Sequence, residues 1–318
     1  MRAAVTGASG FIGRILIENL LADGWNVTVL SRRALQAAPA GKLRHVIGDL
    51  CEAGPHLTEF LRDNDVLFHC AGELYRPAIM EAVHVGGTRN LLAAIAEQVP
   101  ATRPHWIQLS SVGAYGPPQN GAAEPRVITE STPPYPIGPY ETTKTRADEL
   151  VLTAGQAGLI TQTIVRPANV FGEAMTNQSL RALLQMIRRG LFFYIGEPGA
   201  ITNYVHVEDV VAALLACARN PNARDQIYNL SNDCTLEGLA EESARAFDVR
   251  PPLLRVPERA MRMVASLGSA LPRFPLTNER INALVNRTRY PSDKIERELG
   301  IKATISVASR ALSMLDIH

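Results

Sequence analysis

The stretch Arg2-Ala3-Ala4-Val5-Thr6-Gly7-Ala8-Ser9-Gly10-Phe11-Ile12-Gly13 decides the fold of this chain. A short apolar strand, residues 3–5, runs into glycines at positions 7, 10 and 13, and a segment with helical apolar spacing follows. Gly7 allows a tight turn, Gly10 lets a diphosphate approach the backbone, and Gly13 lets the helix lie close to the strand. The positive end of that helix would face the phosphates. The stretch therefore predicts a strand–turn–helix unit that binds a dinucleotide.

The first half of the chain repeats this alternation of strand and helix. We expect further strands at residues 27–30, 44–47, 65–72, 105–109 and 161–166. Helices are expected at residues 11–22, 77–99 and 137–157, with Gly86 and Gly87 weakening the middle of the second. Repeated βα units predict an α/β fold with a doubly wound parallel sheet, because parallel neighbours need right-handed crossovers. Residues 1–172 are therefore predicted to form mainly a dinucleotide-binding Rossmann domain.

The second half has a less regular pattern. Residues 177–190, 207–219, 291–299 and 307–315 favour helices, and short strands are expected near 191–195 and 226–230. We expect residues 173–318 to form mainly a smaller substrate-binding lobe, with part of 207–235 returning to the sheet. Residues 117–139 hold seven prolines and indicate a loop that borders the ligand crevice.

Composition limits the class of protein. The 318 residues carry 32 basic and 31 acidic side chains, a net charge of +1, which gives no reason to expect a nucleic-acid surface. The four cysteines are scattered without metal-ligand spacing, so reduced thiols and no metal are expected. No apolar run approaches 18 residues. These features predict a soluble cytoplasmic protein with no membrane contact.

Two groups of polar residues indicate proton chemistry. Tyr140 and Lys144 are spaced i and i+4, on one face of a predicted helix. A lysine ammonium beside a phenol favours the phenolate, so we expect Lys144 to lower the pKa of Tyr140 toward neutrality. Ser110 and Ser111 follow the strand at 105–109, where ligands bind in open α/β sheets.

Three motifs in this order, T-G-x-x-G-x-x-G, S-S-x-x-x-Y-G and Y-x-x-x-K, resemble the extended short-chain dehydrogenase/reductase family (NAD-dependent epimerase/dehydratase-like). Residues 166–172 and 204–210 resemble two further segments of that family, so the similarity covers most of the chain. The resemblance implies that Tyr140 is the acid/base and that Lys144 binds the nicotinamide ribose and tunes the phenol. It also implies that Ser111 orients the substrate oxygen; Ser110, the rival serine, is expected to be buried and bonded to backbone.

The resemblance, together with the glycine turn, also predicts which residues contact ligands. The expected cofactor-binding residues are Gly7, Ser9, Gly10, Phe11, Ile12, Gly13, Arg32, Arg33, Asp49, Leu50, Ala71, Gly72, Tyr140, Lys144, Pro167 and Val170. The expected substrate-binding residues are Ser110, Ser111 and Asn169.

The end of the second strand bears on the type of cofactor. An NAD enzyme usually has an acidic residue here, whereas this chain reads Ser31-Arg32-Arg33 and has no Asp or Glu between Asp23 and Asp49. A guanidinium can bind a 2′-phosphate through two hydrogen bonds. NADP is therefore predicted over NAD; two solvated arginines are the alternative interpretation.

These residues lead to one preferred function and several alternatives. The preferred function is NADPH-dependent reduction of a keto group on a nucleotide-diphosphate sugar or another bulky carbonyl substrate. The competitor is an NAD-dependent nucleotide-sugar 4-epimerase, or less readily a dehydratase because Val112 stands where an acidic residue is usual. A catalytically silent dinucleotide sensor is the third alternative.

Three residues in two segments depart from the resembled pattern, and the resemblance also bears on assembly. Thr202-Asn203 replaces an Arg-Asp pair, and His84 replaces an asparagine that touches the cofactor or braces the site. The resemblance implies a homodimer paired through helices 77–99 and 137–157, whose apolar stripes are Leu91, Leu92, Ile95, Leu150 and Val151.

Overall fold

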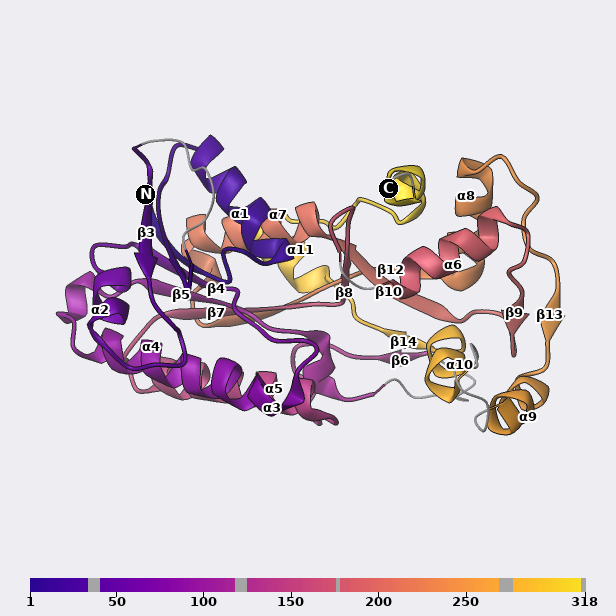
Figure 1. Ribbon diagram of the computed structural model, residues 1–318, viewed down its shortest axis with the longest axis horizontal. Helices are drawn as coiled ribbons and strands as arrows, with labels where there is room; N and C mark the ends of the chain where they lie inside the picture. Colours follow the sequence, from indigo (N-terminus) through magenta and orange to yellow (C-terminus); the bar gives the residue numbers. More distant parts are fainter. Residues whose placement is uncertain (34–40, 118–124, 176–177, 269–276, 316–318) are drawn as a thin grey trace.

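A seven-stranded parallel sheet forms the centre of the computed structural model, which describes residues 1–33, 41–117, 125–175, 178–268 and 277–315 (Figure 1). The strand order is β3-β2-β1-β4-β5-β7-β11, so the predicted doubly wound α/β fold is confirmed. Their bounds are β1 Arg2–Thr6, β2 Asn26–Ser31, β3 Leu43–Ile47, β4 Val66–His69, β5 His105–Leu109, β7 Gln162–Pro167 and β11 Gln226–Leu230.

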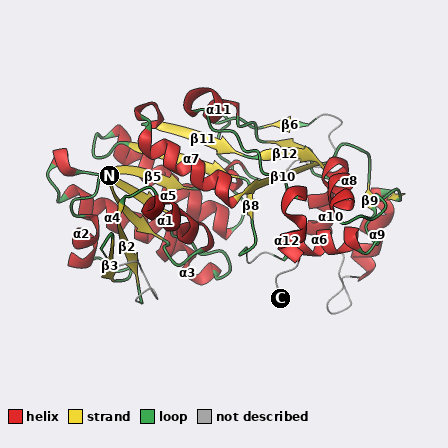
Figure 2. Ribbon diagram, turned by 90° about the horizontal axis from the view of Figure 1, so that it is seen from above, coloured by secondary structure: helices red, strands yellow, loops and turns green. Residues whose placement is uncertain are grey.

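Helices cover both faces of this sheet (Figures 1 and 2). One face carries α1 Phe11–Ala22, α7 Val207–Arg219 and α11 Asp293–Leu299, whose apolar residues join one core cluster with the sheet. The other face carries α2 Pro55–Leu61, α4 Gly87–Ala96 and α5 Pro139–Gln156, which form a second cluster. A sheet covered on both sides needs strands that are apolar throughout, and β4 and β5 are fully buried.

Elements from the second half of the chain, joined by a short strand at residues 126–127, form a second group beyond the end of the sheet (Figure 1). A three-stranded sheet contains β8 Asn169–Phe171, β10 Ile201–His206 and β12 Asn232–Thr235, and two two-stranded sheets pair β9 Tyr194–Ile195 with β13 Arg255–Val256 and β6 Arg126–Val127 with β14 Thr288–Arg289. Its helices are α6 Ser179–Arg188, α8 Leu236–Ala246, α9 Glu258–Gly268, α10 Asn278–Leu284 and α12 Ala311–Leu315.

The long helix expected at residues 77–99 is divided into three parts. It consists of α3 Pro77–Glu81, a π-helical turn at Ala82–Gly86, and α4. The glycine that follows the π turn has a packing reason, because a Cβ at Gly87 would stand 2.6 Å from Cγ of Leu50. The sequence interpretation missed α2 and the three-stranded sheet.

The apolar stripes expected at a dimer interface lie elsewhere. Leu91, Ile95 and Val151 have no exposed surface, and Leu92 is only 9% exposed. They pack against one face of the sheet, and Leu150 is partly buried beside the same cluster. These residues therefore belong to the core and offer no surface for a second copy. Homodimerisation therefore stays a prediction.

Two further findings concern the described ranges as a whole. None of their helices has both the length and the apolar character that crossing a membrane requires. No group of three His, Cys, Asp or Glu side chains in the same ranges is placed to hold a metal ion.

Candidate active site

A crevice of about 230 Å³ opens at the carboxyl ends of four neighbouring strands. Its walls come from residues 6–10 at β1, 30–32 at β2, 48–51 after β3 and 70–73 after β4. The strand order reverses direction between β1 and β4, which is where open α/β sheets bind ligands. The walls include these predicted cofactor-binding residues: Gly7, Ser9, Gly10, Arg32, Asp49, Leu50, Ala71 and Gly72.

Two glycines allow the close packing at the base of this crevice. Gly7 has a φ of +72°, and a Cβ atom there would stand 2.7 Å from the carbonyl carbon of Cys70. A Cβ at Gly13 would stand 2.2 Å from the carbonyl oxygen of Gly7. Neither contact leaves room for a side chain, so α1 can approach β1 and β4 this closely only with glycine at both positions.

The first turn of α1 follows Gly10, which lines the crevice, and its N–H groups lack partners within the helix. Its first helical hydrogen bond runs from Arg14 N–H to the oxygen of Gly10. The N–H groups of Phe11, Ile12 and Gly13 therefore have no acceptor within the helix. Gly10, at the N-cap, has no side chain that could satisfy them. This arrangement fits the diphosphate of a dinucleotide.

The two arginines predicted to bind the cofactor have different positions relative to the crevice. Arg32 lines the wall, whereas Arg33 does not, and its carbonyl oxygen accepts a 2.7 Å hydrogen bond from the Ser31 hydroxyl. The Asp49 carboxylate accepts a 2.9 Å hydrogen bond from the Cys51 N–H, which fixes the turn after β3. Of the two arginines, Arg32 therefore contributes to the wall of this crevice.

Several residues predicted to hold the cofactor do not line this crevice. The side chains of Ile12 and Val170 pack against the core of the sheet, and Phe11 packs against an apolar cluster formed by the second half of the chain. Pro167 is buried at the end of β7. For Phe11 and Ile12 the backbone N–H groups, rather than the side chains, remain the candidates.

Other wall residues were missed by the sequence interpretation. Cys51 follows β3, Glu73 follows β4, and Arg76, Ile79 and Val83 come from the α3 region. The spacing of the last three, at positions 76, 79 and 83, is that of one helix face, and this signal could have identified them.

Tyr140 and Lys144 lie at the carboxyl end of β5. Lys144 is 5% exposed, and its ammonium donates a 2.6 Å hydrogen bond to the carbonyl oxygen of Leu109, the last residue of β5. The Tyr140 ring is half-buried and meets the ring of His84 edge to face, with centroids 5.6 Å apart. Helix α5 thus brings both side chains beside the serines that follow β5.

The protonation of Tyr140 differs from the sequence expectation. Burial first, and then the carboxylates of Glu141 and Asp148, raises the pKa of Tyr140 to about 12. Burial also lowers the pKa of Lys144, while Asp148 acts in the opposite direction. The expected lowering of the phenol pKa is therefore wrong for this structure. The physical reason is that desolvation dominates and the ammonium is bonded to Leu109.

The two serines have different surroundings. Ser111 is half-buried, and its Oγ accepts a 3.1 Å hydrogen bond from the Gly113 N–H at the start of a 3₁₀ turn, Val112–Tyr115. Ser110 is 4% exposed and donates a 2.6 Å hydrogen bond to the Asp148 carboxylate. The expected bond from Ser110 to backbone is thus wrong, and its hydroxyl faces the interior rather than a substrate.

The predicted substrate residue Asn169 is the first residue of β8, which pairs with β10 from the second half of the chain. It is exposed, and its amide donates a 3.0 Å hydrogen bond to the carbonyl oxygen of Asn203. Asn203 itself is 7% exposed and donates to the Asp233 carboxylate and to the carbonyl oxygen of Thr288. Thr202 stands where the resembled family carries a basic residue that binds phosphate. It is 8% exposed, and its hydroxyl donates a 3.2 Å hydrogen bond to the carbonyl oxygen of Cys234.

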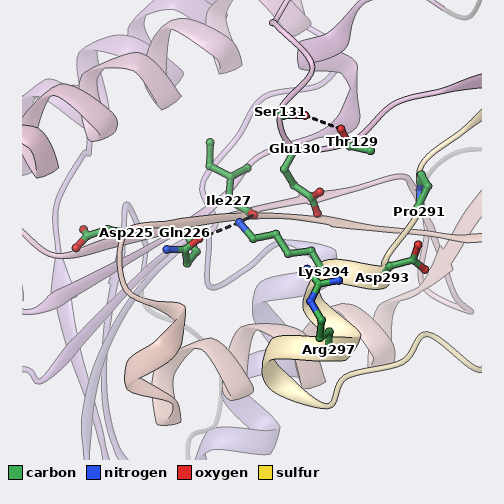
Figure 3. Close-up of a pocket in the computed structure, with 10 residues that line it drawn as sticks. All are labelled: Thr129, Glu130, Ser131, Asp225, Gln226, Ile227, Pro291, Asp293, Lys294 and Arg297. Carbon is green, nitrogen blue, oxygen red and sulfur yellow. Dashed lines mark hydrogen bonds between the residues drawn. The ribbon is translucent and has the colours of Figure 1, made fainter.

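A larger hollow of about 600 Å³ lies beside the edge strand β11 (Figure 3). Lys294 reaches across it and donates hydrogen bonds to the Gln226 side chain and to the carbonyl oxygen of Ile227. The Glu130 carboxylate accepts the N–H of Asn229. These contacts satisfy edge groups that would otherwise pair with another strand. The predicted ligand-binding residues all belong to the described ranges, and none of them lines this hollow.

Residues 3–231 match the sequence profile described as the NAD dependent epimerase/dehydratase family. The chain belongs to this family. It is accordingly an NAD(P)-dependent enzyme of the short-chain dehydrogenase/reductase type.

Relatives within this family have several activities. A 4-hydroxy-2-methyl-3-oxo-4-farnesyl-3,4-dihydroquinoline-1-oxide ketoreductase of Stigmatella aurantiaca is 30% identical in an alignment of 321 positions that covers 96% of this chain and 93% of the relative. A dTDP-6-deoxy-L-talose 4-dehydrogenase (NAD(P)(+)) of Kitasatospora kifunensis is 33% identical over 188 residues, 58% of this chain and 57% of the relative.

Solved structures share the fold. The UDP-glucuronic acid 4-epimerase of Bacillus cereus, in complex with NAD, superposes with a TM-score of 0.73 at 17% identity, over 99% of this chain and 96% of that one. At this level of identity the likeness concerns the fold.

Proposed function

We propose that this protein reduces a ketone with NADPH. The observation that carries the proposal is Arg32 in the wall of the crevice, with no acidic residue between Asp23 and Asp49 in the sequence. A carboxylate at this place would bind the ribose hydroxyls of NAD, whereas a guanidinium suits a 2′-phosphate. A cofactor with that phosphate serves net reduction.

The residues around α5 suit protonation of the product. The reduced dinucleotide would supply hydride to the carbonyl carbon. Tyr140 is protonated at neutral pH because its pKa is raised to about 12, so its phenol can donate a proton to the forming alkoxide. The Ser111 Oγ accepts from the Gly113 N–H, which leaves the hydroxyl proton to bond the same substrate oxygen. Lys144 is proposed to bind the nicotinamide ribose from its position at the end of β5.

A bulky apolar carbonyl suits the surroundings better than a nucleotide sugar. Leu74 and Tyr75, beside the crevice wall, are 55% and 64% exposed, and Tyr135 and Ile137, just before α5, are 69% and 54% exposed. Such apolar side chains near a site favour an apolar ligand. The internal hydrogen bond of Thr202, which replaces a phosphate-binding arginine, and the activity named for the Stigmatella relative support the same choice. The test is a panel of ring ketones and keto-sugar nucleotides with NADPH.

Replacing Arg32 by Ser is expected to raise the KM for NADPH about 10- to 100-fold, because a charge-assisted bond to phosphate is lost. The KM for NADH should change less than about twofold. Steady-state kinetics with both cofactors measure the effect. Arg33→Ser is the matched control, since this side chain does not line the crevice. Equal KM values for NADPH in wild type and Arg32→Ser would refute the NADP preference.

The raised pKa of Tyr140 predicts how the two reaction directions depend on pH. Reduction needs the protonated phenol, so its kcat should change less than about twofold between pH 6 and pH 8. Alcohol oxidation needs the phenolate, whose fraction rises about tenfold per pH unit below the pKa, so its kcat should rise similarly. Profiles of kcat against pH in both directions provide the measurement. A reduction rate that falls across this range would contradict a phenol pKa near 12.

An NAD-dependent nucleotide-sugar 4-epimerase is the second candidate function. The relative from Kitasatospora, named as a dTDP-sugar 4-dehydrogenase, supports the nucleotide-sugar substrate of this candidate. Epimerisation of a nucleotide sugar without net consumption of NADPH would establish it. A dehydratase ranks below it because Val112 follows Ser111, and a silent sensor would bind the dinucleotide without turnover.

The remaining features of organisation are also proposals. We propose a division near residue 172, with β11 and α7 of the second part returning to the sheet. We also propose a cytoplasmic homodimer. Light scattering on the purified chain tests the assembly, and a mass of about 35 kDa, that of one chain, would exclude a dimer.

A further inference from the structure

His84 occupies the π-helical turn between α3 and α4 and is 1% exposed. The turn packs against α5 on one side, and the segment after β4 lies on the other. π-helical turns occur frequently at functional sites because the extra residue re-aims a side chain. Here the imidazole is aimed between the segment that lines the crevice and the helix that carries Tyr140.

Hydrogen bonds to both ring nitrogens fix the tautomer of His84. The Glu73 N–H can only donate, and it lies 2.9 Å from Nε2, so Nε2 accepts. The ring proton is therefore on Nδ1, which donates to the Thr143 Oγ1 at 2.8 Å. The Thr143 hydroxyl then donates to the carbonyl oxygen of Pro139 at 2.7 Å or of Tyr140 at 3.1 Å. The neutral ring thus ties the crevice wall to the first turn of α5.

A second series of hydrogen bonds ends on the backbone of the same residue. The Ala71 N–H donates to the Thr6 hydroxyl, which donates to Nδ1 of His69. Nε2 of His69 donates to Thr88, whose hydroxyl donates to the carbonyl oxygen of His84 at 2.6 Å. The π turn is therefore fixed from the ends of β1 and β4, where the glycine turn begins.

The hydrogen bonds of the His84 ring do not form a proton relay. The His84 ring series ends on backbone carbonyl oxygens, which cannot release a proton onward. Burial first, and then the charge of Lys144, lowers the pKa of His84 to about 4, so the ring stays neutral at physiological pH. His84 instead contacts Tyr140 by ring packing, since the two rings meet at an interplanar angle of 85°.

We propose that His84 is a positioning residue that holds the Tyr140 phenol and the crevice segment after β4 in register with each other. It does so through the neutral Nδ1–H tautomer, with one nitrogen for each side. The inference rests on the proposed role of Tyr140 as proton donor. It goes further by naming the residue that couples the dinucleotide-binding wall to that donor.

Three substitutions separate the contributions of the two nitrogens. His84→Phe keeps a planar ring and removes both hydrogen bonds. His84→Asn places its amide N–H near the position of Nδ1 and can still bond Thr143. His84→Gln places its amide oxygen near the position of Nε2 and can still accept from Glu73. His105→Phe is the matched control. Like His84, His105 is buried and has both ring nitrogens in hydrogen bonds, here to two threonines, but it lies at the start of β5, away from Leu109 and the serines.

Kinetics provide the first measurement. His84→Phe is expected to lower kcat about 10- to 100-fold, with KM for the carbonyl within about threefold of wild type, because misplacing a proton donor affects the transition state more than binding. His84→Asn should recover most of kcat, and His105→Phe should leave kcat per folded enzyme unchanged. An unchanged kcat in His84→Phe, or an equal loss in His105→Phe, overturns the proposal.

Amide hydrogen exchange provides a readout that needs neither cofactor nor turnover. We expect His84→Phe to accelerate exchange in residues 71–76 and 138–144, His84→Asn to accelerate the first segment alone, and His84→Gln the second alone. His105→Phe should affect neither segment. If His84→Phe does not fold, the Asn and Gln variants decide, and identical exchange in both overturns the proposal. If wild type reduces no carbonyl, the proposed function fails, while the exchange pattern still decides whether His84 links the two segments.

Discussion

Tyr140→Phe is expected to lower kcat for carbonyl reduction about 10²- to 10⁴-fold, the usual contribution of a positioned acid. The phenol is the proton donor proposed here, and burial keeps it protonated at neutral pH by raising its pKa to about 12. The substitution removes one oxygen and leaves the ring, which packs edge to face against His84. Single-turnover measurement of cofactor oxidation reports the chemical step directly.

The controls for this variant separate chemistry from folding and binding. Tyr140→Phe should keep the wild-type thermal midpoint and bind NADPH with a Kd within about threefold of wild type, because the glycine turn is unaffected. Tyr135→Phe is the matched control, since this exposed tyrosine precedes α5 and is assigned no chemistry. A Tyr140→Phe enzyme that retains half of wild-type turnover would remove the phenol from the mechanism.

The parts of the site that were readable from sequence depend on local geometry. Gly7 and Gly13 are needed because their own backbone passes within contact distance of β4 and of each other. That requirement follows from a strand, a turn and a helix that are continuous in the chain. The position of Arg32 just after β2 is equally local, and this residue lines the crevice.

The parts that were not readable depend on contacts between distant segments. Lys144 was expected to tune Tyr140, but its ammonium is bonded to Leu109, 35 positions away in sequence. Ser110 reaches Asp148 across 38 positions rather than its own backbone. The sheet of β8, β10 and β12 was missed because two of its strands have only three and four residues and its strands pair across more than 25 residues. Spacing within one helix or strand carries no information about such partners.

Arg166→Met is expected to lower the free energy of unfolding by about 3–5 kcal/mol, the cost of leaving one charge of a buried pair without its partner. Arg166 and Asp148 have side chains that are 2% and 1% exposed, and their closest N–O distance is 3.1 Å. Methionine fills similar volume but cannot donate to the carboxylate. The remaining contacts of Asp148 would be the Ser110 hydroxyl and the charge of Lys144.

Urea unfolding of Arg166→Met, followed by far-ultraviolet circular dichroism, measures this loss through the shift of the midpoint. Arg146→Met is the control on the same helix as Asp148. Arg146 pairs with Glu81 at 2.8 Å, but both side chains are about half exposed, so a loss of about 0–1 kcal/mol is expected. If Arg166→Met were no less stable than this control, Asp148 would be held by Ser110 and Lys144 alone. The carboxylate would then act mainly on the charge of Lys144, the residue proposed to bind the nicotinamide ribose, and Asp148→Asn should alter the pH profile of kcat more than it alters stability.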